Sequence, residues 1–225
     1  MQDLARPLIV TLLLPEIGRS VAVIGYQRPI SIKIMEAFLV SALAVTVGEI
    51  GDKTQLLALL LAARYKKPIP IVLGILIATL ANHALAGLLG QWVASNIPST
   101  LLRWALGLSF LAIAAWTLKP DEMEDEGLSE GKYGVFVLTC ITFFIAEIGD
   151  KTQLATVALA AKYSNLYLVI AGTTLGMLIA DIPAVFLGKI AAPNFPFKIV
   201  RWIAAGVFAI LGILVLMGIG DQFMS

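Results

Sequence analysis

Apolar residues dominate the chain in long stretches, which short polar segments interrupt. Six of these stretches are long enough to cross a bilayer as helices, because a helical span needs roughly 20 residues. They cover about residues 36–63, 69–95, 99–118, 134–161, 165–190 and 199–220. The segments between them hold charged residues, Asn and Pro, which end helices. The pattern therefore predicts an all-α polytopic membrane protein with six transmembrane helices.

The first 34 residues do not fit this pattern. The apolar run LIVTLLLP at 8–15 ends in Pro15, and the charged residues Glu16 and Arg19 follow it. A signal peptide is not expected, since no small-residue cleavage site follows the run. We expect residues 1–34 to form an interfacial or loosely ordered extension, with a short additional helix as the alternative.

The composition supports the assignment to the membrane. The 225 residues are 59% hydrophobic and 14% charged, whereas soluble proteins average about 45–50% apolar and about 25% charged residues. The net charge of +1 gives no basic surface, so a nucleic-acid partner is not expected. The single Cys140 excludes an internal disulfide and a metal site built from several cysteines.

The sequence repeats itself at an offset of 98 residues. The heptapeptide EIGDKTQ occurs at 49–55 and again at 147–153, and Gly74 aligns with Gly172 in the same register. Such a match indicates a duplicated unit of three predicted helices. The predicted organisation is an N-terminal extension (1–34), repeat 1 (35–118), an acidic cytoplasmic loop (119–133), repeat 2 (134–220) and a C-terminal tail (221–225).

Three helices per repeat have a topological consequence. The second unit enters the membrane from the opposite face, so the two copies are inverted about an axis in the membrane plane, an architecture that transporters use. Lys and Arg are concentrated after the first, third and fifth predicted helices. The positive-inside rule places those loops in the cytoplasm, although the basic residues of the N-terminal extension oppose this orientation.

Each copy of the motif places charged residues near the middle of a predicted membrane helix. A charge at the bilayer centre costs roughly 2.5–3.5 kcal/mol on insertion scales, so these side chains are expected to face the protein interior. A Glu and an Asp three positions apart share one face of a helix. Inverted symmetry brings the two faces together. The predicted site contains four carboxylates, those of Glu49, Asp52, Glu147 and Asp150.

Four converging carboxylates suit a hard divalent cation such as Mn²⁺, Mg²⁺ or Ca²⁺, which prefers oxygen ligands. One His and one Cys argue against a zinc or copper site. With the two motif lysines, the four carboxylates carry a net charge of −2, which one divalent ion neutralises. Because protons compete with the ion for closely spaced carboxylates, the residues favour proton–cation exchange.

The remaining motif residues have predicted supporting roles. Lys53 and Lys151 balance the charge by pairing with a motif carboxylate, as Glu49 and Lys53 do at i and i+4 of a helix. The motif glycines allow either a close backbone approach or a helix break that offers carbonyl oxygens. The supporting ligand or gate candidates are Gly51, Thr54, Gln55, Gly149, Thr152 and Gln153. The alternative is that both clusters are fixed ion pairs that only hold the helices together.

A further pair of polar residues lies in the next helix of each repeat. His83 aligns with Asp181 under the offset, and Asn82 lies beside His83. His83 and Asp181 are candidates for a proton relay, because His changes protonation near neutral pH. The alternative is that each is a hydrogen-bonded residue of helix packing.

The repeated EIGDKTQ motif resembles the GDT family of cation/proton exchangers, over about residues 35–220. Both copies match the family pattern Glu-x-Gly-Asp-(Lys/Arg)-(Ser/Thr). The family includes Golgi and chloroplast manganese/calcium transporters and bacterial manganese exporters. The resemblance implies that the motif acids carry the ion, that Mn²⁺ is the usual substrate and Ca²⁺ an alternative one, and that the protein lies in a bacterial inner membrane. No cofactor is implied.

The leading hypothesis is therefore a secondary transporter that exports Mn²⁺ from the cytoplasm in exchange for protons. A Ca²⁺/H⁺ exchanger is the alternative within transport. A non-transporting membrane assembly factor is the alternative from a different class, although it would leave the intramembrane acids without a purpose. An enzyme is not expected, because the chain has no HExxH motif and no Ser/His/Asp pattern.

Overall fold

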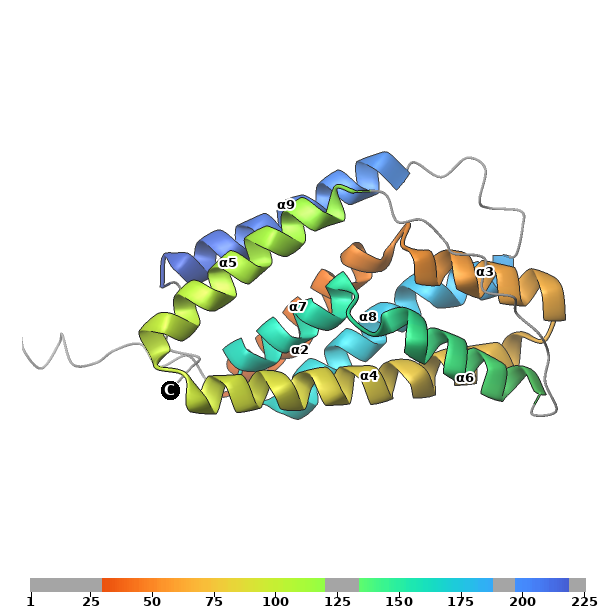
Figure 1. Cartoon of the computed structure of the whole chain (residues 1–225), viewed down its shortest axis with the longest axis horizontal. Helices are drawn as coiled ribbons and strands as arrows, with labels where there is room; N and C mark the ends of the chain where they lie inside the picture. The colour runs from red at the N-terminus through yellow and green to blue at the C-terminus, as the bar shows by residue number, and fades with distance from the viewer. Residues whose placement is uncertain (1–29, 120–133, 188–196, 219–225) are drawn as a thin grey trace, which may run out of the picture. The chain divides into compact units, whose positions relative to one another are not determined.

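The computed structural model describes residues 30–119, 134–187 and 197–218, and all regular secondary structure in these ranges is helical (Figure 1). The chain divides into a unit of residues 1–33 and a unit of residues 34–225, and the second contains both motifs. The helices are α2 (Ile30–Glu49), α3 (Lys53–Tyr65), α4 (Pro68–Asn96), α5 (Ser99–Thr117), α6 (Gly134–Glu147), α7 (Lys151–Lys162), α8 (Leu166–Leu187) and α9 (Phe197–Leu216).

Three of these helices, α4, α5 and α8, are long and apolar enough to cross a membrane by length and composition. The apolar helix α6 and the apolar part of α9 are shorter. The predicted segments 69–95, 99–118, 165–190 and 199–220 correspond to α4, α5, α8 and α9, with ends that differ by a few residues. The all-helical membrane class is thus confirmed.

The prediction of continuous helices over 36–63 and 134–161 is wrong, because each helix is broken inside the motif. The chain leaves the helix after Glu49 and after Glu147 and re-enters it at Lys53 and at Lys151. Gly51 and Gly149, inside the two breaks, have φ angles of 83° and 76°. This left-handed conformation carries little penalty for glycine and a substantial one for other residues. Of the two roles expected for the motif glycines, the structure shows the helix break.

Most of the predicted non-helical segments lie outside the described residues. This holds for the extension up to residue 29, for the acidic loop from residue 120 to residue 133 and for the tail 221–225. The end of the predicted extension is different, because α2 already begins at Ile30. The first helix therefore starts earlier than the predicted residue 36.

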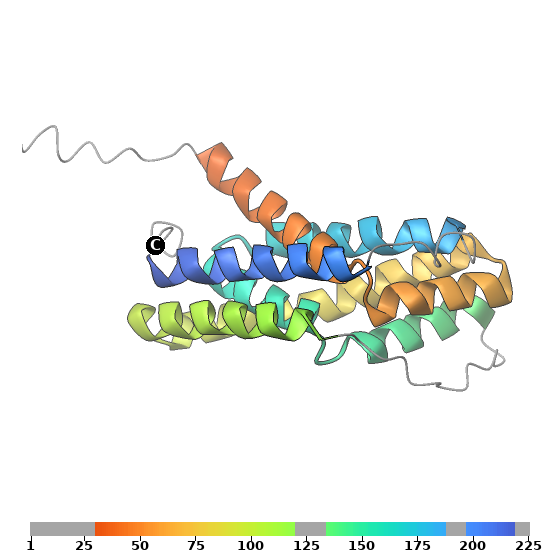
Figure 2. The same ribbon diagram turned by 90° about the horizontal axis from the view of Figure 1, so that it is seen from above.

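The helices pack so that two apolar cores flank a polar interior. Helix α5 lies along α9, while α4 contacts α6, α7 and α8 (Figures 1 and 2). One core joins α2, α5, α7, α9 and the start of α8 around Phe110 and Phe208. The other joins α3, α4, α6 and α8 around Leu61 and Phe143. Both motif breaks lie on helices that contribute to the two cores, so packing on either side holds them in place.

Equivalent glycines of the two repeats make equivalent close contacts. A Cβ atom added to Gly74 on α4 would lie 2.6 Å from Cβ of Thr139 on α6. A Cβ atom added to Gly172 on α8 would lie 3.0 Å from Cβ of Ser41 on α2. Gly172 is the repeat 2 equivalent of Gly74, and Thr139 is the repeat 2 equivalent of Ser41. The same contact therefore occurs twice: the glycine of repeat 1 packs on repeat 2, and the glycine of repeat 2 packs on repeat 1.

The closest of these approaches gives a stability prediction. A Cβ atom added to Gly90 on α4 would lie 2.2 Å from the backbone oxygen of Val157 on α7. Gly90→Ala is therefore expected to destabilise the protein by about 1–3 kcal/mol through overpacking, which exceeds the gain of about 1 kcal/mol in helix propensity. Thermal denaturation of the purified protein in detergent measures the effect.

Gly206→Ala is the matched control for this prediction. It also lies inside a helix, α9, but an added Cβ atom meets no heavy atom within 4 Å. The thermal denaturation midpoint of Gly206→Ala is expected to stay the same or to rise slightly, because only helix propensity changes. Equal shifts for the two variants would contradict the close approach of α4 and α7.

Candidate cation site

The two motif aspartates occupy the N-cap positions of the second half-helices. Asp52 precedes α3 with an extended backbone, φ −83° and ψ 169°. Asp150 precedes α7 in the same conformation, and its Oδ2 accepts a hydrogen bond of 3.2 Å from the backbone N–H of Thr152. Asp is a favoured N-cap residue, because its carboxylate accepts from the free N–H groups of the first turn. The sequence thus sets where each second half-helix starts.

The glutamates lie on the other side of each break. Glu49 is the last residue of α2, and Glu147 is the last residue of α6. Each Glu–Asp pair therefore flanks a break and does not share a face of one continuous helix, so that part of the sequence argument is wrong. The turn at each break nevertheless joins the two acids of a motif, because the backbone N–H of Asp52 donates to the backbone oxygen of Glu49 at 2.9 Å and that of Asp150 to the backbone oxygen of Glu147 at 3.1 Å.

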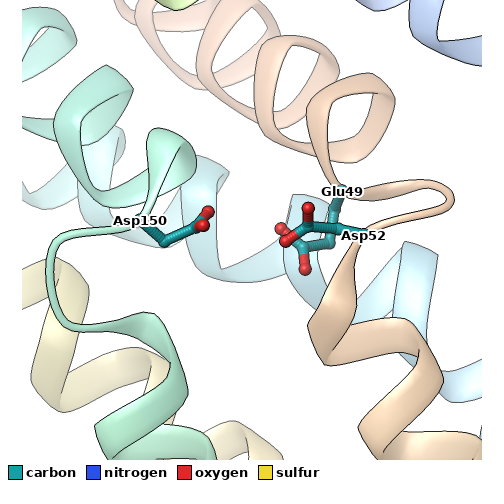
Figure 3. A group of neighbouring side chains, drawn as sticks. All are labelled: Glu49, Asp52 and Asp150. Carbon is teal, nitrogen blue, oxygen red and sulfur yellow. The ribbon is translucent and has the colours of Figure 1, made fainter. Parts of the chain in front are cut away.

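The tertiary structure brings acids of both motifs together (Figure 3). Carboxylate oxygens of Glu49, Asp52 and Asp150 lie within 4.8 Å of one another. All three side chains are buried. Glu147 is also fully buried, but it does not belong to this group of three. Three of the four predicted carboxylates thus converge within the distance that one cation could bridge.

The lysines pair across the two motifs. Lys53 Nζ lies 3.3 Å from Oδ1 of Asp150, and Lys151 forms an ion pair with Asp52. The predicted pair of Glu49 with Lys53 is wrong, because the helix break between them removes the i, i+4 geometry. Lys151 is buried, whereas the Lys53 side chain is 30% exposed. The two ion pairs connect the breaks to each other and neutralise both aspartates.

The motif threonines contact the motif glutamates. Thr152 Oγ1 donates a hydrogen bond of 3.1 Å to Oε2 of Glu147, and Thr54 donates to Oε1 of Glu49. Each glutamate therefore has one oxygen held in place. Its second oxygen, Oε2 of Glu49 and Oε1 of Glu147, is buried and has no hydrogen-bond partner among the described residues. Such an oxygen is costly to bury unless a ligand satisfies it.

The motif glutamines hold the breaks against neighbouring helices. Gly51 N–H donates to Oε1 of Gln55 at 2.9 Å, and Gln55 Nε2 donates to the backbone oxygen of Ala180 on α8 at 2.9 Å. In the other repeat, Gly149 N–H donates to Oε1 of Gln153 at 2.7 Å. Both amide oxygens thus accept a hydrogen bond from the break, and their use as cation ligands stays a prediction.

One contributor to this arrangement was not among the predicted site residues. Asn82 on α4 accepts a hydrogen bond of 3.3 Å from Gln153 Nε2 and donates one of 3.0 Å to the backbone oxygen of Phe144 on α6. Asn82 thereby connects α4 to both halves of the second broken helix. The only sequence signal for Asn82 was an amide inside an apolar stretch, and the equivalent position in repeat 2 is Ala180.

His83 and Asp181 are both fully buried. Neither ring nitrogen of His83 and neither carboxylate oxygen of Asp181 has a hydrogen-bond partner within the part of the chain that the structure describes. The alternative of hydrogen-bonded packing residues therefore finds no support among these contacts. Their predicted role in a proton relay stays a prediction.

The geometry at the breaks can be compared with known proteins. Residues 37–125 and 135–222 each match a family described as "Divalent cation/proton antiporter GDT1". The chain belongs to the GDT1 family. The two matches reproduce the duplication, and the GDT1 description is that of a transporter and not of an enzyme. The resemblance inferred from EIGDKTQ is thus confirmed.

Relatives within the GDT1 family cover most of the chain. A Vibrio cholerae protein named "Putative manganese exporter" is 50% identical over 181 residues, which are 80% of this chain and 90% of that protein. A GDT1-like protein of Synechocystis is 32% identical over 200 residues, 80% of this chain and 96% of its own. GDT1-like protein 3 of Oryza sativa is 31% identical over 202 residues, 78% of this chain and 71% of its own. No solved structure gives a significant match.

Proposed function

We propose that this GDT1 protein exports Mn²⁺ from the cytoplasm in exchange for inward-moving protons. The observation that carries the proposal is the buried group of Glu49, Asp52 and Asp150, which draws carboxylates from both motifs. Oxygen ligands of this kind suit Mn²⁺, Mg²⁺ and Ca²⁺. The name of the Vibrio cholerae relative favours manganese among them.

The proposed architecture is six spans in two inverted repeats. Helices α2 and α3 together form one broken span, and α6 and α7 form its counterpart in the second repeat. The equivalent contacts of Gly74 and Gly172 support this arrangement, as do the crossed ion pairs between the motifs. Broken helices at the interface of inverted repeats bind substrate in many secondary transporters.

Exchange follows from competition at this site. Cation binding is electrostatically favourable only while the carboxylates are ionised, so protons and the cation displace each other. We propose that one repeat moves against the other to expose the site alternately to the two sides. Glu147 joins as the fourth ligand, Thr54 and Thr152 orient the glutamates, and His83 and Asp181 are proton-relay candidates.

The proposed location is the bacterial inner membrane, with the basic loops and the acidic loop in the cytoplasm. In this orientation the last turn of α3 and the connection that follows it, which together hold Arg64, Lys66 and Lys67, face the cytoplasm. This placement follows the positive-inside rule.

Reconstitution tests the proposed function directly. The full chain is placed in liposomes that contain a pH-sensitive dye and a metal-sensitive dye, and Mn²⁺, Ca²⁺ or Mg²⁺ is added outside. We expect Mn²⁺ to enter while the interior loses protons. An imposed pH gradient with the acidic side inside the liposomes is expected to accelerate the uptake. Empty liposomes serve as the control.

Other outcomes of this experiment favour other functions. A larger proton-coupled flux with Ca²⁺ than with Mn²⁺ would favour the Ca²⁺/H⁺ exchanger. A rate of cation entry that does not depend on the pH gradient would favour a channel. No flux of any cation through correctly folded protein would favour the assembly factor.

A further inference from the structure

The first half of each broken helix is hydrogen-bonded to a neighbouring helix three residues before the motif glutamate. In repeat 1, Thr46 Oγ1 on α2 donates to the backbone oxygen of Gly176 on α8 at 3.2 Å. The equivalent residue on α6 is Phe144, whose side chain has no donor. In repeat 2 the direction is therefore reversed, and Asn82 on α4 donates to the backbone oxygen of Phe144 at 3.0 Å.

The second half of each broken helix is held through its motif glutamine. Gln55 Nε2 on α3 donates to the backbone oxygen of Ala180 on α8 at 2.9 Å. Gln153 Nε2 on α7 donates to Oδ1 of Asn82 on α4 at 3.3 Å. Ala180 and Asn82 are equivalent positions of the two repeats. Each glutamine thus bonds to the same position of a neighbouring helix, but the acceptor is a main-chain oxygen in repeat 1 and a side chain in repeat 2.

The two hydrogen bonds of repeat 2 therefore meet at one side chain. Asn82 is fully buried, and its amide group donates to α6 and accepts from α7. The two bonds of repeat 1 end on the backbone oxygens of Gly176 and Ala180. Since every residue type supplies a backbone oxygen, these two bonds use no side chain of α8.

The oxygen that Asn82 satisfies lies at the end of α6. Ile148, the first residue after this helix, donates its N–H to the backbone oxygen of Ile145 at 3.2 Å, three residues earlier. The last carbonyl groups of a helix have no partner within it, and a buried carbonyl without a partner is costly. Asn82 supplies the donor that Phe144 needs at this point. The end of α6 thus depends on a residue of α4.

The same side chain is linked to the turn between the two acids of the second motif. Gln153, which donates to Asn82, also accepts a hydrogen bond of 2.7 Å from the backbone N–H of Gly149. Gly149 lies between Glu147, the last residue of α6, and Asp150, the N-cap of α7. Asp150 is the member that repeat 2 contributes to the buried group of three carboxylates. The position of this carboxylate therefore depends on how the turn is held.

We propose that Asn82 is a positioning residue of the cation site. It does not touch the cation, but it holds the second break, and with it the Asp150 carboxylate, in the geometry that binds the ion. This inference rests on the proposed function and makes the two halves of the site unequal. The half from repeat 2 depends on one side chain of α4, whereas the half from repeat 1 is held on backbone oxygens of α8.

Transport kinetics distinguish positioning from stability. Asn82→Ala is expected to raise the apparent KM for Mn²⁺ uptake into liposomes about tenfold, because residues that orient metal ligands typically change metal affinity by this factor or more. A loss of folded protein alone lowers the maximal rate and leaves KM unchanged. Thr79→Val is the matched control. It removes a buried hydroxyl group of the same helix that has no hydrogen-bond partner among the described residues, and its KM is expected to stay unchanged.

A double variant tests whether Asn82 acts through the second break. If it does, Asn82→Ala combined with Gln153→Ala raises KM by less than the product of the two single increases, since both changes release the same turn. Asn82→Ala combined with Gln55→Ala, which lies in the other break, is expected to give the full product. A full product for the pair of Asn82 and Gln153 would overturn the inference.

Hydrogen exchange tests the same inference without transport. Amide exchange of the full chain in detergent is followed by mass spectrometry in peptides that cover residues 49–55 and 147–153. Both contain EIGDKTQ, so their intrinsic exchange rates are alike. Asn82→Ala is expected to accelerate exchange in 147–153 about fivefold, as the loss of one net hydrogen bond predicts, and to leave 49–55 unchanged. No acceleration in 147–153, or equal acceleration in both peptides, would contradict a local role of Asn82.

The remaining outcomes are also decisive. Folded Asn82→Ala protein with the KM of the unsubstituted chain overturns the inference. If Asn82→Ala does not fold, Asn82→Leu replaces it and is judged by the same outcomes, because it fills the position but forms neither hydrogen bond. Failure of the unsubstituted chain to move any cation contradicts the proposed function, whereas hydrogen exchange still decides whether Asn82 holds the second break.

Discussion

Glu49→Gln is expected to lower the initial rate of Mn²⁺ uptake into liposomes at least about 100-fold, which corresponds to about 2.7 kcal/mol. The physical reason is that Glu49 has no cationic partner among the described residues and lies in the group with Asp52 and Asp150. An amide of the same shape keeps the hydrogen bond from Thr54 but removes the negative charge that attracts the ion.

The controls for this prediction separate the site from general loss of fold. Glu124→Gln removes one negative charge from the sequence between the two repeats and is expected to keep at least about half of the activity, because Glu124 lies outside both motifs. Glu147→Gln is expected to resemble Glu49→Gln, since the motifs are equivalent in sequence. Normal Mn²⁺ uptake by folded Glu49→Gln protein would contradict the proposed site.

Lys151→Met is expected to destabilise the protein by about 3–5 kcal/mol, because it leaves the buried carboxylate of Asp52 without its ammonium partner. Both side chains of this pair are buried. The double variant Asp52→Asn/Lys151→Met removes both charges, and Asn keeps a favoured N-cap residue before α3. It is therefore expected to recover most of the lost stability while transport remains impaired.

Denaturation of the single and double variants in detergent gives the coupling between the two residues as a double-mutant cycle. Lys53→Met is the matched comparison, since Lys53 makes the equivalent pair with Asp150 but is 30% exposed. Its loss of stability is expected to be smaller, because water screens a partly exposed pair. Additive effects of Asp52→Asn and Lys151→Met would show that the crossed ion pair contributes nothing.

The positions of the helix ends show which helix boundaries could be predicted from the sequence pattern. The limits of α4, α5, α8 and α9 agree with the prediction to within a few residues, because the change from apolar to polar residues marks where each apolar helix ends. The breaks after Glu49 and Glu147 were not predicted as helix ends, because the apolar stretches continue on both sides of each motif. The apolar pattern continues through both motifs, and only the glycines indicated that a break was an option.

For the candidate site, the sequence predicted which residues take part but not which of them pair. The identities of the acids, lysines and threonines could be chosen from the repeat, because a charge inside an apolar stretch needs a compensating function. Their pairing could not, since it depends on contacts between residues about 100 positions apart. Asp181 had a sequence signal only as the counterpart of His83, and the chain order did not show that both side chains would be fully buried.

By itself the sequence determined the helical membrane class, the duplication, the GDT family and the residue types of the candidate cation site, because these follow from composition, periodicity and a repeated motif. The tertiary structure alone decided that the lysines cross to the aspartates of the other motif. It also decided that one carboxyl oxygen of Glu49 and one of Glu147 are buried without a hydrogen-bond partner among the described residues. The physical reason is that electrostatic interaction depends on distance in space and on burial. Both are set by how α2, α3 and α8 pack against each other and not by the spacing of residues along the chain.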